Sequence, residues 1–378
     1  MLPATTSFNP DDPLSPRRNQ AGLTLIELMV AMVISIIVGV AIFEVFIQNE
    51  YSYLRNRSTG DIVNSDRHAL HVLSNYLSNA GYGLSLPGCQ QTYAYLNGAA
   101  TPYAGITVSP AGTPTSITPA PVTLTINLSA SQFAGVPIGQ MVQSPQPNAS
   151  NFQLNSAPGS TTCQTPVQSG DKLIAAFNGG VCGLVIATKT PGSNAGACVV
   201  TFDHGQSQPN NPPGGFSTLI PNLTVGEMDA AQVYDLGNGN IDTIQFSVIA
   251  GTASTPGSLQ MAMGGSTPAL FAAGIDDLQV LFGYNTGGGQ SVTSYGYYDP
   301  TYATDIRTVT ISMVAQSKIK TPGTVTPTKI LVIPAVPTSQ SLTGTALPAI
   351  YYQPPTGVTN EEFNLMTTTV PVMNLIWH

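Results

Sequence analysis

The chain holds 378 residues, of which 8% are charged and 42% hydrophobic, and its formal net charge is −8 with a pI near 4.7. The apolar content excludes an acidic disordered tail. The acidic balance, with no Lys/Arg run beyond the pair Arg17-Arg18, disfavours nucleic-acid binding by bulk charge. The 37 glycines and 31 prolines, among many uncharged polar residues, are typical of a turn-rich β protein with long loops.

A long apolar segment occupies residues 23–47. A membrane-spanning helix needs about 20 mostly apolar residues, so we expect a single transmembrane helix here. Arg17 and Arg18 precede the segment, and the next basic residue is Arg55. The positive-inside rule therefore predicts a cytoplasmic N-terminus, with residues 48–378 on the far side of the membrane. No small-x-small cleavage site follows the apolar segment, which argues against an ordinary secretory signal peptide.

Glu27 lies inside this apolar segment, where a carboxylate costs at least about 2.5–3.5 kcal/mol in hydrocarbon. Cleavage after Gly22 would make Leu23 a new N-terminus, with an α-ammonium group four residues from Glu27. That amine, on the same chain or on a neighbour, can pair with the carboxylate and offset much of its burial cost. A plain membrane anchor explains the length and orientation of the segment but not Glu27.

The run RRNQAG at residues 17–22, followed by LTLIELMVAM at residues 23–32, resembles the prepilin signal of type IV pilins. The resemblance implies cleavage after Gly22 by a prepilin peptidase, N-methylation of Leu23 and an assembly role for Glu27. In that family the glutamate pairs with the N-terminus of a neighbouring subunit. The family usually has Phe at the first mature position, where this chain has Leu23. The implied partners are the peptidase, the inner membrane, and other major and minor pilins bound through the N-terminal helix.

The helical pattern continues over residues 48–81, where apolar residues recur at three- and four-residue steps and Gly81 is suited to end the helix. We expect this amphipathic second half of the helix to pack on a globular head. The run Asn79-Ala80-Gly81-Tyr82-Gly83 before Cys89 is similar to PilW-like minor pilins. Further similarity to PilW-like proteins lies at residues 274–284, 306–314 and 362–374.

The expected fold is therefore α+β: a long N-terminal pilin helix, apolar in its first half, packed on a largely antiparallel β-sheet head with long loops. A leader covers residues 1–22 and the head covers residues 82–378. Residues 84–170 look loop-rich, with one alternating strand at residues 121–128, and are a candidate inserted subdomain. Further strands are predicted at residues 172–177, 184–188, 198–202, 232–236, 243–248, 278–284 and 308–314.

The segment Gly237-Asn238-Gly239 lies between two predicted strands and predicts a β-hairpin. The oxygen-bearing side chains in and around this segment could also be interpreted as a calcium loop, built from Asp235, Asn238, Asn240 and Asp242. The EF-hand pattern fails, because glycines stand where oxygen ligands are needed and no Glu closes the loop. Turn chemistry is the better interpretation.

The four cysteines are Cys89, Cys163, Cys182 and Cys198, and none lies in a C-x-x-C pair or at zinc-ligand spacing from a His. They are either free buried thiols or two disulfides, and an exported chain favours disulfides. Of the three possible connectivities we favour Cys182–Cys198, because the Pro- and Gly-containing interval between them can turn two strands back on each other. That choice leaves Cys89–Cys163.

No G-x-S-x-G, H-E-x-x-H or P-loop motif is present, and charged residues are sparse. The acidic pair Asp276-Asp277 falls on a predicted strand edge, where adjacent side chains point to opposite faces and cannot share a substrate. We therefore expect no enzyme activity, no cofactor and no metal.

The resemblance implies a minor pilin that takes part in type IV pilus assembly, in priming or at the tip, with links to twitching motility and cell adhesion. We expect the protein in the inner membrane before assembly and in the extracellular pilus afterwards. A minor role is favoured over a major one because a large head on every helix would hinder side-by-side packing. Two alternatives stay open: a minor pseudopilin of a type II secretion system, of the J type, and a surface adhesin on a simple membrane anchor.

Overall fold

The computed structural model describes residues 24–84, 86, 89, 91–96, 98–129, 136–142, 146–155, 165–194, 197–203, 210–238, 243–252, 254–317, 319–320 and 326–373. The chain divides into two compact units, residues 1–53 and residues 54–378. Helix α1 (Leu25–Ser78) contributes its first half to one unit and its second half to the other. The expected α+β class, with a long N-terminal helix and mostly antiparallel sheets, is confirmed.

In the second unit, α1 buries one stripe of side chains. The buried positions recur at steps of three or four residues, which is the period of an α-helix face. They are Ser58, Ile62, Asp66, Ala69, Leu73 and Leu77. The chain leaves the helix through Gly81, whose φ of 76° lies in the left-handed region that glycine adopts without strain.

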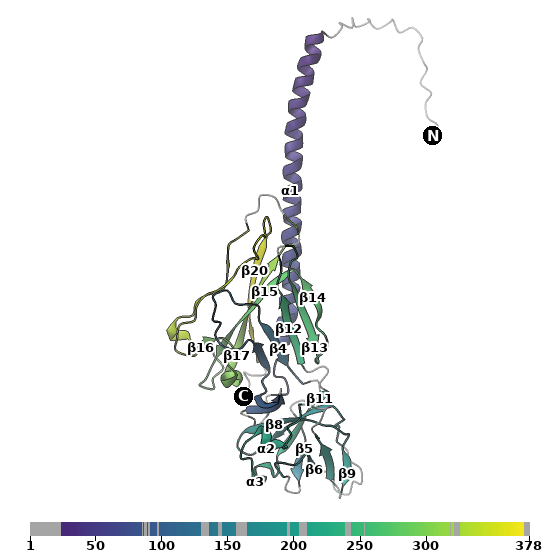
Figure 1. The fold of residues 1–378 in the computed structure, drawn as a ribbon, viewed down its shortest axis with the longest axis vertical. Helices are drawn as coiled ribbons and strands as arrows, with labels where there is room; N and C mark the ends of the chain where they lie inside the picture. The colour runs from purple at the N-terminus through teal and green to yellow at the C-terminus, as the bar shows by residue number, and fades with distance from the viewer. Residues whose placement is uncertain are drawn as a thin grey trace, which may run out of the picture. The chain divides into compact units, whose positions relative to one another are not determined.

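Two antiparallel sheets of the second unit share a hydrophobic core with this stripe (Figure 1). One sheet, in the order β14-β13-β12-β4-β3, contains β3 (Ile106–Ser109), β4 (Thr123–Asn127), β12 (Thr243–Ile249), β13 (Ser258–Met263) and β14 (Ala269–Ala273). The other, in the order β16-β15-β17-β20, contains β15 (Ile275–Tyr284), β16 (Ser294–Gly296), β17 (Ile306–Gln316) and β20 (Phe363–Pro371). Every residue of β15 is buried.

A nine-stranded sheet forms a second lobe of the same unit (Figure 1). It has a core of its own built around packed phenylalanines. Its order is β2-β1-β8-β7-β11-β5-β6-β10-β9. Its strands are β1 (Gln91–Leu96), β2 (Ala99–Pro102), β5 (Pro137–Val142), β6 (Asn151–Asn155), β7 (Asp171–Ala176), β8 (Val181–Ile186), β9 (Gly192–Asn194), β10 (Ala197–Thr201) and β11 (Gln232–Asn238). The short helices α2 (Phe216–Leu219) and α3 (Val225–Met228) complete that core.

The remaining elements include a small sheet that shares a hydrophobic core with β15 and β17. They are the two-stranded sheet of β18 (Ile330–Ile333) and β19 (Ile350–Tyr352), and the 3₁₀ helices η1 (Pro300–Asp305) and η2 (Thr338–Gln340).

Each predicted strand overlaps a strand of the structure, but the expectation of only one strand within residues 84–170 is wrong. Six strands, β1 to β6, begin in that segment. Strand β4 is the alternating strand that was predicted. Strands such as β1, β2 and β5 are four to six residues long and contain Ala, Thr, Tyr or Pro, so they lack the sustained β-branched alternation that marks a strand in sequence.

The hairpin predicted at Gly237-Asn238-Gly239 is also wrong. Strand β11 pairs with β5 and β7, whereas β12 pairs with β4 and β13 in a different sheet. The register of β11 against β7 shifts between Asp235 and Gly237, and Gly237 has a φ of 85°. Asp235 Oδ1 accepts a hydrogen bond from Gly237 N at 2.8 Å. The glycine signal thus marks a β-bulge stabilised by an Asp side chain, and the expected turn chemistry at Asp235 is present. Asn240 and Asp242 lie outside the described residues.

The favoured disulfide pairing needs correction as well. Cys89 is bonded to Cys182, with their Cα atoms 5.6 Å apart. The expected pair Cys182–Cys198 required β8 and β10 to be neighbours, but β7, β11, β5 and β6 lie between them in the sheet. Cys198 is itself disulfide-bonded, and Cys163, the expected partner of Cys89, lies outside the described residues.

The Cys89–Cys182 bond joins the segment just before β1 to β8, and these two strands form a parallel pair. The bonded residues are 93 positions apart, so the bond removes much of the chain entropy that this long-range pairing would otherwise cost.

We therefore expect the double variant Cys89→Ser/Cys182→Ser to lower the free energy of unfolding of the head by about 2–5 kcal/mol. Urea unfolding of the full chain in detergent, followed by tryptophan and tyrosine fluorescence, measures the change. The same treatment of the unmodified protein with and without reductant is the control, and equal midpoints for variant and unmodified protein would contradict the prediction.

Candidate functional site

The first turn of α1 is closed by a reciprocal pair of hydrogen bonds between Thr24 and Glu27. Thr24 N and Thr24 Oγ1 donate to Glu27 Oε2 at 2.9 and 3.0 Å, and Glu27 N donates to Thr24 Oγ1 at 3.3 Å. This is a capping box, in which side chains satisfy backbone donors that the helix leaves unpaired. It holds the carboxylate at the positive end of the helix dipole, where a negative charge is favoured.

Glu27 is thus placed one turn from the expected new N-terminus. Gly22 and Leu23, the predicted cleavage and methylation residues, lie outside the described residues. Both bonds that Glu27 accepts go to Oε2, and no bond to Oε1 is present within the described part of the chain. One carboxylate oxygen therefore caps the helix while the other is available. The capping role could have been predicted from the spacing Thr-x-x-Glu at residues 24–27.

The apolar side chains of α1 that follow Glu27 are exposed as far as Phe46, and none of the large hydrophobic residues from Leu25 to Phe46 is buried. Among the described residues, one helix is long and apolar enough to cross a membrane, and it is α1. Because the exposed apolar residues surround the helix instead of forming one stripe, this half is suited to lipid or to the core of a helix assembly.

The second half of α1 places a carboxylate in its buried stripe. Asp66 is fully buried and accepts a hydrogen bond from Asn364 Nδ2 of β20 at 3.1 Å through Oδ2. Its Oδ1 has no hydrogen-bond partner in the described structure. Burial raises the pKa of Asp66 to about 7, an effect that the Asn364 bond opposes. Sequence reasoning missed Asp66, although it stands at the helical spacing of the stripe, four residues after Ile62 and three before Ala69.

An ion pair ties the same part of α1 to the residue before β20. Arg55 Nε donates to Glu362 Oε1 at 2.9 Å, and Thr59 Oγ1 donates to Glu362 Oε2 at 2.9 Å. The Arg55 side chain is 68% exposed, so the pair itself stabilises the head little. Together with Asp66–Asn364 it fixes where β20 begins along α1.

The acidic pair Asp276-Asp277 lies at a β-bulge of β15, where the register against β17 shifts. The strict alternation assumed for adjacent strand residues therefore does not apply there. Both carboxyls are buried, and burial raises the pKa of Asp276 to about 6 and that of Asp277 to about 7. Burial is the largest cause that raises the pKa of the Tyr352 hydroxyl, and the negative charges of Asp276 and Asp277 raise it further.

Each of these acids is held by neighbouring elements. Asp276 accepts bonds from Gly257 N and, at 2.9 Å, from the Tyr352 hydroxyl of β19. Asp277 accepts a bond from Gln279 Nε2 at 2.9 Å. A Cβ atom on Gly257 would lie 2.5 Å from Asp276 Oδ1, so the close approach of this turn to the carboxylate requires glycine. The hydrogen bonds of Asp276 thus connect β15 to β19 and to the turn before β13, so this carboxyl has a structural role.

Comparison with known proteins agrees with the N-terminal geometry. Residues 17–43 match the family described as the prokaryotic N-terminal methylation motif, a type IV prepilin-like signal. The motif supports a type IV pilin-like or pseudopilin protein, and it implies processing by a prepilin peptidase and assembly with pilins. With the apolar helix, it is consistent with anchoring in the inner membrane before assembly. No curated protein and no solved structure is significantly similar to the chain.

The burial of Asp66 predicts a pH dependence of stability. Its pKa is about 7 in the folded state and about 3.9 in the unfolded state, so the folded state holds the proton more tightly. The contribution of Asp66 to stability is then greatest below about pH 4 and is lost as the pH rises to about 7.

We expect Asp66→Asn, which stays neutral, to raise the free energy of unfolding at pH 7.5 by about 2–4 kcal/mol and to reduce its slope between about pH 4 and 7. Urea unfolding across that pH range measures both effects. Asp61→Asn, an exposed acid on the same helix, is the matched control. An unchanged slope in Asp66→Asn would show that the buried carboxyl is not the titrating group.

Proposed function

We propose that this protein is a minor pilin of a type IV pilus, similar to PilW-like proteins, that acts in the priming or at the tip of the filament. The observation that carries the proposal is the position of Glu27. Its carboxylate lies in the first turn of an exposed apolar helix, within residues 17–43 that match the prepilin-like motif, and the next charged residue of the helix is Glu44. A charge in that position needs a cationic partner once the helix leaves water.

The proposed mechanism has three steps. The apolar half of α1 inserts in the inner membrane, with residues 48–378 outside. The peptidase then cuts after Gly22, and Leu23 becomes a methylated N-terminus. Finally, the carboxylate of Glu27 pairs with the amine of a neighbouring pilin as the helix moves from lipid into the filament core, where the low dielectric constant strengthens the pair.

The size of the head supports a minor role. Two lobes with separate hydrophobic cores follow α1 in the second unit. A filament built from thousands of such subunits would have to accommodate both lobes beside every helix, whereas one copy at a tip would not. A minor pseudopilin of a type II secretion system shares these features, and a deletion strain distinguishes the two: loss of surface pili supports the proposal and loss of protein secretion supports the alternative.

Glu27 has two roles in this proposal, and substitutions can separate them. Glu27→Gln keeps a side chain that can complete a capping box but removes the charge. Thr24→Ala removes the cap, at a cost of about 1 kcal/mol to the helix start, but keeps the charge. We expect Glu27→Gln and Glu27→Ala to be processed normally but to be absent from pili, and Thr24→Ala to be incorporated.

Immunoblots of sheared pili and of membranes from strains that carry each variant measure incorporation and processing separately. Normal incorporation of Glu27→Gln would show that the glutamate acts only as a helix cap, and the charge-pairing step would then have to be abandoned.

Processing is tested at the preceding residue. We expect Gly22→Val to retain residues 1–22, because a β-branched side chain at the cleavage position cannot replace glycine in the peptidase site. Intact mass spectrometry of the membrane-bound protein reads the N-terminus directly, with Ala21→Ser as a control that leaves Gly22 in place. Retention of residues 1–22 in the unmodified protein would instead support a surface adhesin on a simple membrane anchor.

A further inference from the structure

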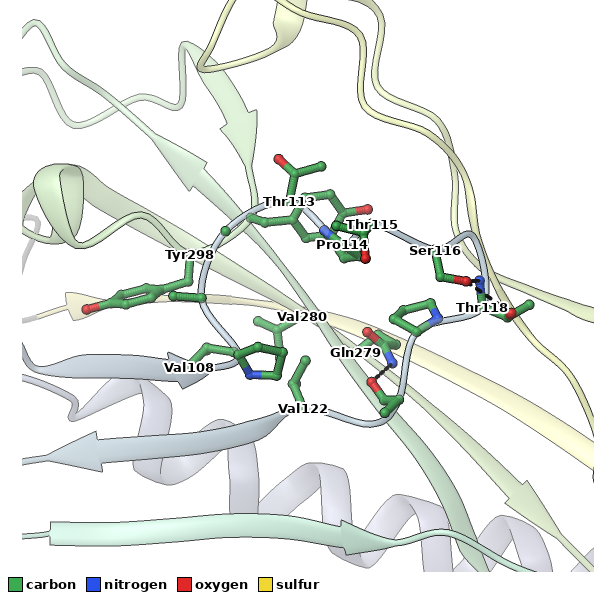
Figure 2. Close-up of a pocket in the computed structure, with 16 residues that line it drawn as sticks. Val108, Thr113, Pro114, Thr115, Ser116, Thr118, Val122, Gln279, Val280 and Tyr298 are labelled. Carbon is green, nitrogen blue, oxygen red and sulfur yellow. Dashed lines mark hydrogen bonds between the residues drawn. The ribbon is translucent and has the colours of Figure 1, made fainter.

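The loop at residues 110–122, which connects β3 to β4, encloses a cavity of about 390 Å³ against β15 (Figure 2). Four hydrogen bonds attach the loop to three other parts of the head. They are Gly112 N to Tyr298 O at 2.8 Å, Tyr351 N to Ile117 O at 2.7 Å, Gln279 Nε2 to Ala120 O at 3.1 Å, and Val122 N to Leu278 O at 3.0 Å. These bonds attach both ends of the loop to the head before any ligand is present.

The lining of the cavity is mixed in polarity and uncharged. Figure 2 shows the side chains of Val108, Val122 and Val280 on one side and the segment Thr113–Thr118 on the other. No Lys, Arg, Asp, Glu or His is among the lining residues, which all belong to the described part of the chain. Ligand sites of this size usually combine apolar walls with a few fixed polar groups. Charged ligands find no counter-ion here.

Tyr297 supplies a polar group that has no partner. The residue lines the cavity and is 7% exposed, and its hydroxyl has no hydrogen-bond partner among the described residues. Burial raises the pKa of Tyr297 to about 12, so the hydroxyl stays protonated at neutral pH and can donate. Buried hydroxyls are normally bonded, and an unpaired one needs a reason. The neighbouring Tyr284 follows the rule, since its hydroxyl donates to Tyr297 O at 2.8 Å.

We propose that this cavity binds a neutral saccharide unit, with a sugar oxygen accepting the hydrogen bond of the Tyr297 hydroxyl. The ring faces of a sugar are apolar and suit the valine, proline and tyrosine walls, whereas its hydroxyl groups need uncharged donors and acceptors such as the loop threonines and Gln279. The segment Thr113–Ser116, in which Thr113, Thr115 and Ser116 are exposed, lies between the attachments at Gly112 and Ile117. In this proposal it is the part that moves aside to admit the sugar to the buried hydroxyl. This inference does not depend on the proposed function, because the site lies wholly in the head.

The test uses the full chain in a zwitterionic detergent without a sugar headgroup. Isothermal titration calorimetry is run with N-acetylglucosamine, galactose and lactose as neutral probes. N-acetylneuraminic acid is the charged comparison, and a proline-rich peptide is the alternative ligand. We expect a neutral sugar to bind and the charged sugar to bind at least about tenfold more weakly.

Four variants locate the binding. Tyr297→Phe should weaken sugar binding about tenfold without lowering the thermal midpoint, because the lost hydroxyl has no partner in the free protein. Tyr284→Phe loses a buried hydrogen bond and should lower the midpoint by about 2–4 °C while keeping the affinity for sugar. Thr115→Trp, on the exposed segment of the loop, should abolish binding, and Thr345→Trp, exposed elsewhere on the head, should not.

Three results would overturn the proposal. They are the absence of binding by every neutral sugar, binding of the peptide alone, and sugar binding that Tyr297→Phe and Thr115→Trp both leave unchanged. A fall in the thermal midpoint of Tyr297→Phe equal to that of Tyr284→Phe would also count against it, because the hydroxyl would then be bonded within the protein.

Discussion

The helix α1 has to satisfy two different surroundings along one continuous run of residues. Its first half exposes apolar side chains on every side, and its second half buries a single stripe against two sheets. A helix that is apolar all round is stable only where lipid or other helices cover it, whereas an amphipathic helix needs one packed face. The division of the chain into two units near Tyr53 follows from this change in pattern. The head is fixed to the chain by the stripe that begins at Ser58.

That stripe contains a buried carboxylate, Asp66, which apolar packing alone would not require. Leu73 and Leu77 bury enough surface to hold α1 on the sheets, but similar side chains one turn away could serve equally well. The bond between Asp66 and Asn364 can be made in one alignment only, and the Arg55–Glu362 pair agrees with it. Burying a carboxylate costs stability, so the pair is best explained as a device that fixes the alignment of β20 on α1.

The sequence predicted those features whose cause lies within a few neighbouring residues. The apolar segment, the position of Glu27 within it and the strands with sustained alternation, such as Thr308–Val314, all belong to this class. The capping box of Thr24 and Glu27 and the position of Asp66 in the helix stripe are equally local and could have been predicted. Features that depend on strand order could not be predicted, because no short segment specifies which strands meet in a sheet.

The cysteines and the glycines at 237–239 illustrate that limit. Cys182 and Cys198 are close in sequence and have turn residues between them, yet their strands are separated by four others. Gly237 does mark a local feature, but the feature is a register shift within β11 and not a turn that joins two strands. The unpaired hydroxyl of Tyr297 also depends on residues far away in the sequence. The loop that encloses the cavity beside Tyr297 lies more than 170 residues earlier in the chain.

The capping box and the proposed assembly contact make compatible demands on Glu27. The helix cap uses Oε2 alone, and it fixes the carboxylate in the orientation that leaves Oε1 without a bond in the described residues. A carboxylate that is already held by its own helix loses little further freedom when an ammonium group arrives, so more of the electrostatic attraction remains as binding free energy. The cap also keeps the charge at the favourable end of the helix dipole while the helix is in lipid. Thr24 therefore begins the helix and holds Glu27 through Oε2 alone, which leaves the charge and Oε1 for the proposed contact with a neighbouring chain.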